Sequence, residues 1–266
     1  MSLPLPFPSP GHAGERPPRP DYGIDSPQVV GWLALGGMLG IIAGIMLFLW
    51  LRPVHPALAG LVLNWGLWGG LSCLVTVAGM LWSSKVGKGR AVERMLAAIP
   101  WRGDELVLDV GCGRGLVVTA AAKRLTTGKA IGVDIWRTSD QSGNRPEAAW
   151  ANARAEGVAE RIDIRDGDAR QLPFEDDTFD VVLSSLVLHN IPGRAGREQA
   201  LREMVRVLRP GGYLAVLDMV HSSEYTRTLR ACGMVDVTRS RPFFLFFAPA
   251  RIVTARKPPA GSNQVP

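Results

Sequence analysis

Leu106-Val-Leu-Asp-Val-Gly-Cys-Gly-Arg-Gly115 is the stretch of the sequence that decides the fold. Its first five residues form a mostly apolar run, which is typical of a strand buried on both faces of a parallel sheet. Three glycines spaced two apart follow, and a turn without Cβ atoms lets a ligand approach the main chain closely. Residues 116–125 can form a helix whose N-terminus points into that turn. A strand, a glycine turn and a helix in this order predict a nucleotide-binding site at the carboxyl edge of the sheet.

Strands and helices alternate over residues 105–257, which predicts an α/β domain with a doubly wound, mostly parallel, seven-stranded sheet. A helix over about 197–208 should stop before the Pro-Gly-Gly of residues 210–212. The last two strands have no helix between them, so we expect an antiparallel hairpin at one edge. The expected strands are 106–110, 130–134, 162–165, 179–185, 213–218, 235–240 and 248–255.

Two uncharged segments, residues 29–51 and 57–82, precede this domain. Each is longer than the roughly 20 helical residues that cross the hydrocarbon core of a bilayer. The connection Arg52-Pro-Val-His-Pro56 is very short, so the two helices should run antiparallel. We expect a transmembrane helical hairpin, and the alternative is a pair of buried helices in a globular protein.

Glycines repeat every four residues within both segments, a spacing that lets two helix backbones approach closely. Glycine is also common in membrane helices in general, so this pattern has a second explanation. The repeated glycines are Gly36, Gly40 and Gly44 in the first segment and Gly66 and Gly70 in the second.

The flanking segments complete the domain organisation. Residues 1–28 hold eight of the twenty prolines and should be disordered or extended. Residues 83–104 should form a juxtamembrane linker with a short amphipathic helix over about 90–99. Residues 258–266 should be a tail.

Basic residues gather directly after the second apolar segment, against Arg52 alone in the connection between the two. Cytoplasmic flanks of membrane helices carry such an excess. Both termini and the α/β domain should therefore lie in the cytoplasm, at an inner membrane of the bacterial type. The basic residues concerned are Lys85, Lys88, Arg90 and Arg94.

Composition limits the class of partner. The net charge of +6 is modest and scattered, which suits a domain beside an anionic bilayer and argues against nucleic acid. The three cysteines and four histidines are dispersed, so we expect neither a disulfide framework nor a metal site.

Acidic residues end the second and third strands of the domain. Asp134 lies about twenty residues after the glycine turn, where a carboxylate can accept hydrogen bonds from both hydroxyls of a ribose. Asp168 lies where an adenine amino group could donate to it. Leu116 occupies the third glycine position of the dinucleotide fingerprint, which argues against an NAD or FAD domain. Each aspartate alone could simply cap a turn, but this order and spacing are hard to attribute to chance.

With these motifs the sequence resembles the class I S-adenosylmethionine-dependent methyltransferases, and among them the ubiquinone/menaquinone-biosynthesis type. The resemblance covers about residues 90–257, leaves out the apolar segments, and implies a Rossmann-like fold with S-adenosyl-L-methionine as the cofactor. It rests on Leu108-Asp-Val-Gly-Cys-Gly-Arg-Gly115, Gly132-Val-Asp134, Gly167-Asp-Ala169, Leu172-Pro-Phe174, Phe179-Asp180 and Leu208-Arg-Pro-Gly-Gly-Tyr-Leu214.

The resemblance also implies which residues contact each part of the cofactor. Asp134 would bind the ribose hydroxyls, Asp168 the adenine amino group, and the main-chain N–H of Ala169 an adenine nitrogen. Ile135 and Trp136 would lie near the adenine. The residues expected at the methionine part are Asp109, Gly111, Gly113, Gly115, Ser184 and Ser185.

Methyl transfer from a sulfonium is an in-line displacement, so alignment can supply much of the acceleration. A general base matters only if the acceptor must lose a proton. His189 and His221 follow the fourth and fifth strands and are the candidate bases, although the histidine after the fourth strand is often structural in the family. Asp218 and Tyr225 are weaker candidates.

Residues 136–145 depart from the family pattern, and the aromatic residues 243–247 belong to none of its motifs. The polar loop over residues 136–145 could contact substrate through Asp140, Gln141 or Asn144, or could be an ordinary solvated loop. The aromatic residues 243–247 should form a buried edge strand, and the alternative is that they face the membrane or shape an apolar acceptor pocket.

We therefore expect a membrane-anchored methyltransferase whose acceptor is small and apolar, such as a quinone, an isoprenoid or a lipid. One alternative is a membrane-anchored methyltransferase of a protein or a soluble metabolite. Another is a catalytically silent cofactor-binding scaffold, against which the intact Asp134 and Asp168 argue.

Overall fold

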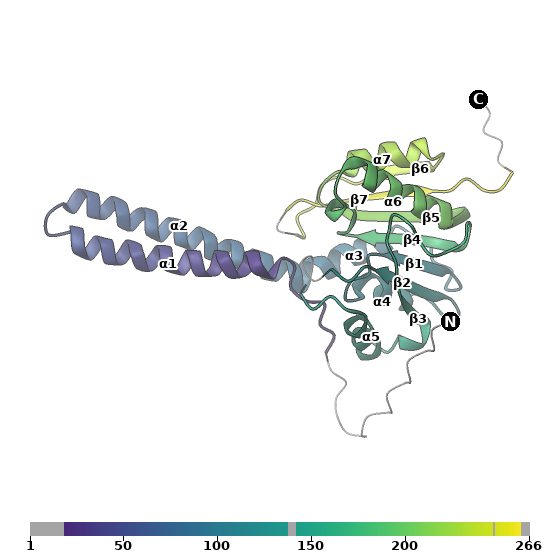
Figure 1. Ribbon diagram of the computed structural model, residues 1–266, viewed down its shortest axis with the longest axis horizontal. Helices are drawn as coiled ribbons and strands as arrows, with labels where there is room; N and C mark the ends of the chain where they lie inside the picture. Colours follow the sequence, from purple (N-terminus) through teal and green to yellow (C-terminus); the bar gives the residue numbers. More distant parts are fainter. Residues whose placement is uncertain (1–18, 138–141, 247, 262–266) are drawn as a thin grey trace, which may run out of the picture.

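The computed structural model describes residues 19–137, 142–246 and 248–261, which form a helical hairpin and an α/β domain (Figure 1). The strands are β1 (Leu106–Val110), β2 (Lys129–Asp134), β3 (Ile162–Asp166), β4 (Phe179–Ser185), β5 (Leu208–Asp218), β6 (Val235–Arg239) and β7 (Arg251–Arg256). The α-helices are α1 (Pro27–Leu51), α2 (Pro56–Trp82), α3 (Lys88–Leu96), α4 (Leu116–Ala122), α5 (Pro146–Ala155), α6 (Arg194–Val207) and α7 (Ser222–Ala231). The short helical turns are η1 (Ser83–Gly87), η2 (Ala159–Arg161) and η3 (Leu188–Asn190).

The strands form one seven-stranded sheet in the order β3-β2-β1-β4-β5-β7-β6. The first five strands in this order, β3, β2, β1, β4 and β5, are parallel to one another. Strand β7 is antiparallel to both of its neighbours, β5 and β6. The predicted mostly parallel, seven-stranded sheet with an antiparallel edge hairpin is therefore confirmed. The strand order reverses between β1 and β4, and a crevice at the carboxyl ends of parallel strands opens at such a point.

The boundary between α6 and β5 differs from the sequence prediction. The helix ends at Val207, and β5 begins at Leu208 instead of Tyr213. Leu208 pairs with Phe179, and the register then shifts before Tyr213 pairs with Val181. The Pro-Gly-Gly motif is therefore an irregularity inside the strand and not a loop in front of it. Proline lacks the N–H that a helix would need, so the chain leaves the helix before it.

Helices cover both faces of the sheet (Figure 1), and alternate strand residues face the two layers. Val107 belongs to a buried cluster with residues of α3 and α4, and Leu108 to a second cluster with residues of α6 and α7. This alternation of side chains is the two-residue period of a strand. Burial on both faces explains why β1 is apolar throughout apart from Asp109.

Helices α1 and α2 form an antiparallel hairpin that projects away from the domain (Figure 1). Their backbones touch at glycines: a Cβ added at Gly66 would lie 2.8 Å from the Cα of Gly44, and one at Gly70 would lie 2.5 Å from the carbonyl oxygen of Gly37. A Cβ at Gly36 would meet nothing within 4 Å. The expected glycine contact is present at Gly44, Gly66 and Gly70, but Gly37 takes the place of Gly36. A Cβ at Gly40 would also meet nothing within 4 Å, and only the carbonyl oxygen of Gly40 lies close to Gly66.

Helix α2 continues into the domain without a flexible linker. The π-helical turn η1 joins it directly to α3, which packs against the domain with Ala91, Val92, Met95 and Leu96 fully buried. The expected amphipathic helix of residues 90–99 thus begins earlier, at Lys88. The hairpin and the domain are joined by a continuous helix, and residues 83–104, expected as a linker with a short helix, are mostly helical.

The expected disordered or extended tail over residues 1–28 includes a segment that docks on the domain. Residues 21–26, which we call the strap, hydrogen-bond to several domain side chains immediately before α1 begins. Composition alone suggested an undocked chain, because proline-rich segments bury little apolar surface. The strap is held by polar contacts instead.

The aromatic residues 243–246 do not form the expected edge strand: they lie in the loop between β6 and β7, with an isolated bridge from Phe243 to Ala250, and their side chains face two environments. Phe243 and Phe246 are buried in the cluster that includes α3, whereas Phe244 is 73% exposed. Phe247 lies outside the described residues. The loop packs tightly on the base of the hairpin, since a Cβ added at Gly87 would overlap the carbonyl oxygen of Leu245.

Candidate functional site

A cavity of about 310 Å³ lies at the carboxyl edge of the sheet. Residues that directly follow or end the five parallel strands line it, as expected for a ligand site in a doubly wound sheet. These residues are Gly111 after β1, Asp134 at the end of β2, Gly167 after β3, Ser185 at the end of β4 and Met219 after β5.

The glycine turn after β1 requires glycine for steric reasons. Gly111 and Gly115 have φ values of 77° and 84°, in the left-handed region that favours glycine. A Cβ added at Gly111 would lie 2.2 Å from a side-chain carbon of Val187. The main chain of this turn therefore forms a close-packed floor on which a ligand can rest.

Asp134 lies at the centre of this floor. Its Oδ2 accepts a hydrogen bond from the N–H of Gly113 at 2.8 Å, and its Oδ1 accepts one from the N–H of Trp136 at 2.6 Å. The amide of Asn144 also donates to Oδ1, at 3.3 Å. The carboxylate lines the cavity, and Oδ2, which has one donor, has a further lone pair with which to accept from a hydroxyl.

Asp109 lies beneath the turn and is fully buried. Its Oδ2 accepts the N–H of Val118 at 3.0 Å, whereas its Oδ1 has no hydrogen-bond partner among the described residues. Burial, together with the nearby charge of Asp134, raises the pKa of Asp109 to about 8. Asp109 is not among the described residues that line the cavity, so its expected role at the methionine part of a cofactor stays a prediction.

Three of the residues expected near an adenine also belong to the wall of the cavity. Asp168, Ala169 and Ile135 all line it. Arg170 forms an ion pair with Asp168 at 2.6 Å and lowers the pKa of that carboxyl, so it is ionised at neutral pH. Trp136 is not among the described residues that line the cavity, because its indole N–H donates to Asp166 at the end of β3.

Ser184 and Ser185 differ in position. The hydroxyl of Ser184 is fully buried and donates to the carbonyl of Val110, so it braces β4 against β1. Ser185 lines the cavity. The neighbouring loop contributes Asn144 to the lining, whereas Asp140 and Gln141 lie outside the described residues.

His189 reaches the cavity from η3 and is oriented by a buried acid. Its Nδ1 lies 2.7 Å from Oδ1 of Asp218, and its main-chain N–H donates to Oδ2 of the same residue at 3.1 Å. Asp218 also accepts from the hydroxyl of Tyr225 at 2.9 Å and from the N–H of Met219 at 2.7 Å. The structure thus joins three sequence candidates into one hydrogen-bonded group.

His221 does not join this group. It lies at the N-terminus of α7, its Nδ1 is 3.8 Å from Glu224, and the lining of the cavity does not include it among the described residues. Glu224 is itself paired with Arg197 through two bonds of 2.9 Å. The geometry therefore favours His189 over His221 as the residue that meets a substrate.

The comparisons with known proteins agree with this site. Residues 108–216 match a family model described as a methyltransferase domain. The matched residues make up most of the sheet domain, and they support S-adenosyl-L-methionine as the methyl donor. The matched region includes the glycine turn, Asp134, Asp168 and the His189 loop.

Two curated relatives and one solved structure illustrate the range of similar proteins. Demethylmenaquinone methyltransferase of Lactiplantibacillus plantarum is 37% identical over 127 residues, which are 47% of this chain and 50% of the relative. The chloroplastic 2-phytyl-1,4-beta-naphthoquinone methyltransferase of Arabidopsis thaliana is 34% identical over 155 residues, 57% of this chain and 56% of the relative. The chain spans about half the length of the curated relatives it matches.

The structure described as the [4+2]-cyclase SpnF has a TM-score of 0.53 at 20% identity and covers 64% of this chain and 82% of its own. This likeness concerns the fold alone. Its name is that of a cyclase, so the fold by itself does not fix the reaction.

The observed residues fit the cofactor of the methyltransferase domain. The glycine floor would accept its methionine part, Asp134 the ribose hydroxyls, and Asp168 with Ala169 the adenine. The feature of this chain that supports the assignment is Asn144, which lines the cavity, donates to Asp134 and has an amide oxygen with no hydrogen-bond partner among the described residues.

Proposed function

We propose that the protein is a membrane-anchored methyltransferase, which transfers the methyl group of S-adenosyl-L-methionine to a small, apolar or lipid-like acceptor. The observation that carries the proposal is the shared cavity. It combines the cofactor residues, His189 and residues at the base of the apolar hairpin within one space.

The outer surface of the hairpin supports a membrane location. Both helices are long and apolar enough to cross a bilayer, which by itself is a weak argument. Their large apolar side chains, however, point outward instead of into a protein core. Soluble monomers rarely expose an apolar surface of this extent. The most exposed of these side chains include Trp32, Met46, Trp50, Trp65 and Trp68.

The position of the cavity supports an acceptor that arrives from the bilayer. Asp25 and Ser26, which directly precede α1, and Lys88 of α3 all contribute to its lining. A molecule dissolved in the membrane would meet this wall first. The exposed ring of Phe244, in a loop packed on Gly87 at the base of the hairpin, suits contact with the bilayer surface.

The names of the two relatives agree with an acceptor of this kind, since one names a demethylmenaquinone and the other a 2-phytyl-1,4-beta-naphthoquinone. For this chain a quinol is accordingly the first acceptor to test. A quinol hydroxyl or its activated ring carbon must lose a proton during methylation, which gives a general base a role.

His189 can serve as that base. Its Nδ1 faces the carboxylate of Asp218, so Nδ1 carries the ring proton and Nε2 can accept another. The acceptor's proton passes to Nε2 while its electron pair forms the new bond to the methyl carbon. When bound, S-adenosyl-L-methionine would supply an electrophilic sulfonium methyl group and a sulfur that can take up the electrons of the broken bond. Asp218 stabilises the imidazolium that results.

Binding of S-adenosylhomocysteine to the purified full chain in detergent, followed by calorimetry, tests the cofactor assignment. We expect binding with one site per chain, and its loss in Asp134→Ala. The matched control is Asp163→Ala, a half-buried β3 residue that is paired with Arg165 and is not among the described residues lining the cavity. Equal affinity in the native chain and Asp134→Ala would contradict the assignment.

A further inference from the structure

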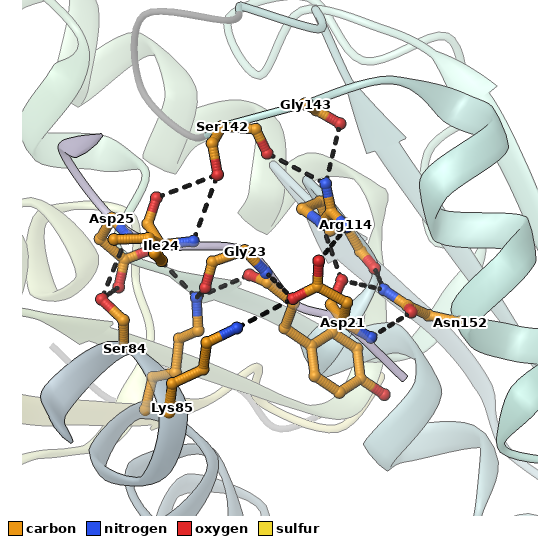
Figure 2. Close-up of polar contacts among 12 residues, drawn as sticks. Asp21, Gly23, Ile24, Asp25, Ser84, Lys85, Arg114, Ser142, Gly143 and Asn152 are labelled. Carbon is orange, nitrogen blue, oxygen red and sulfur yellow. Dashed lines mark hydrogen bonds and ion pairs between the residues drawn. The ribbon is translucent and has the colours of Figure 1, made fainter. Parts of the chain in front are cut away.

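Side chains from five separate segments hold the strap, residues 21–26, against the domain (Figure 2). The strap is continuous with the first residue of α1, so whatever fixes it also fixes the base of the hairpin. The side chains that hold it are Ser84 of η1, Lys88 of α3, Arg114 of the glycine turn, Ser142 after β2 and Asn152 of α5.

Asn152 ties the strap to the glycine turn directly. Its amide accepts from the main-chain N–H of Asp21 at 2.8 Å and donates to the carbonyl of Asp21 at 2.9 Å. The same amide donates to the carbonyl of Arg114 at 2.8 Å. Asn152 is 4% exposed, so water competes little for these three bonds. One side chain thereby fixes the strap and the turn relative to each other.

Arg114 makes the second connection from within the turn. Its guanidinium donates to the carbonyl of Asp21 at 2.8 Å and to the carboxylate of Asp21 at 2.9 Å. It also donates to the carbonyl of Ser142 at 3.1 Å, in the loop that follows Asp134 (Figure 2). The guanidinium therefore bridges three segments that surround the cofactor residues. Charge-assisted, forked bonds of this kind are the geometrically specific ones.

Lys88 fixes the middle of the strap from the hairpin side. Its ammonium donates to the carbonyls of Tyr22 and Gly23 at 2.7 and 3.2 Å and to the carboxylate of Asp25 at 3.1 Å. Burial lowers the pKa of Lys88, so these acceptors are what make the buried ammonium tolerable. All three of its N–H groups face strap oxygens, which makes Lys88 a support for the strap.

Gly23 allows the close approach. Its φ is 71°, and an added Cβ would lie 3.0 Å from a side-chain carbon of Arg114 and 3.3 Å from the carbonyl oxygen of Ser142. A larger residue here would push the strap off the glycine turn without altering any residue of the domain. The position thus offers a way to test the strap alone.

We propose that Arg114 and Asn152 are positioning residues of the methyl-transfer site: they join the strap to the glycine turn, so that strap docking and cofactor binding stabilise each other. The inference rests on the proposed function, because it assumes that the turn binds the cofactor. Since the strap leads into α1, the placement of the hairpin in the bilayer and the shape of the cofactor site are linked. The hairpin then has a role in the site beyond anchoring.

The experiment uses the full chain in lipid nanodiscs, with S-adenosylhomocysteine as the probe. Gly23→Ala should weaken its binding by about fivefold or more, the lower end of typical coupling between sites. Hydrogen exchange of the amides of residues 21–26 should become faster in the variant. In the native chain the probe should slow exchange of the same amides, because linkage is reciprocal.

Gly157→Ala is the matched control. Its φ is also positive, at 70°, but an added Cβ would meet nothing within 4 Å, so probe affinity should not change. Lys88→Met is a second strap-releasing variant, which leaves the carbonyls of Tyr22 and Gly23 without their donor. It should reproduce the effect of Gly23→Ala, with unchanged exchange of the β1 and β4 amides.

Faster strap exchange in both variants with unchanged probe affinity would overturn the inference. A native chain that binds no probe would instead overturn the proposed function, and the inference with it. The two failures are therefore distinguishable from the same data.

Discussion

Asp134 and Asp109 differ in burial and in the number of hydrogen bonds that their carboxyl groups accept. Asp134 is held ready by three donors at the cavity floor, whereas Asp109 has one donor and an unsatisfied oxygen in the interior. Burial disfavours the charged form of a carboxyl, and a pKa shift is also a statement about stability. Asp109 should therefore make the stability of the fold depend on pH.

Asp109→Asn should flatten the pH dependence of stability. The pKa of about 8 in the folded state lies above the ordinary aspartate value, so the native state holds the extra proton. The associated stability is complete below about pH 4 and is lost as the pH rises towards 8, by at most about 1.4 kcal/mol per pH unit. Denaturant titrations of both proteins in detergent at pH 5.5, 6.5 and 7.5 measure this. Parallel profiles would contradict the burial argument.

His189→Gln should lower kcat on a quinol acceptor by roughly 10² to 10⁴ fold, the usual contribution of a general base, with unchanged affinity for S-adenosylhomocysteine. Asp218→Asn should act in the same direction, because the ring loses the carboxylate that orients it. His221→Gln tests the other histidine and should change kcat little, since this residue faces Glu224 at the start of α7. A larger loss in His221→Gln than in His189→Gln would reverse the assignment.

At the scale of elements, the hairpin depends on glycine contacts between its two helices. Gly66→Val places a side chain where an added Cβ already lies 2.8 Å from the carbonyl oxygen of Gly40, so the helices must separate. Overpacking of this kind costs about 1 to 3 kcal/mol. Gly69→Val is the control, because its Cβ position is open. Thermal unfolding in detergent should show a lower midpoint for Gly66→Val alone, and equal midpoints would contradict the packing.

The elements of the sheet could be predicted well from the sequence because their signals are local. Apolar runs such as 106–110 and the glycines that end them determine a strand and a turn without reference to the rest of the chain. The helix-to-strand junction at Leu208 was predicted less well. There the pairing of Leu208 with Phe179, a contact between distant residues, extends the strand through Pro-Gly-Gly.

The site could be predicted in part, for the same physical reason. Strand ends place Asp134, Asp168 and His189 at one edge, so their positions at the cavity follow from the strand pattern. The contacts of Asp21 with Arg114 and Asn152 join residues more than ninety positions apart and leave no periodic signal. Similarly, nothing in the spacing distinguished His189 from His221 before the bond to Asp218 was known.

At the scale of the whole molecule, the hairpin, the strap and the domain form a connected arrangement (Figure 1). A continuous helix runs from α2 through η1 into α3. The strap, which hydrogen-bonds to Arg114 of the glycine turn, leads into α1. The hairpin is thus attached to the domain at both of its ends. This double attachment would hold the cavity near the bilayer surface in a fixed orientation.

The orientation itself is a further prediction. Lys85, Arg90 and Arg94 follow the second helix, and such residues favour the cytoplasmic side. A reporter that folds only in the cytoplasm should therefore be active when it is fused after Pro266. Activity of a reporter that works only outside the cytoplasm would reverse the orientation.

The central claim is methyl transfer to a membrane-dissolved acceptor, and the destination of the methyl group tests it most directly. The full chain in nanodiscs that contain a prenylated naphthoquinol without its ring methyl is supplied with methyl-labelled S-adenosyl-L-methionine. The account predicts label in the organic-solvent extract, and none with Asp134→Ala. Label confined to protein or to the aqueous phase, or no transfer in any fraction, would contradict it.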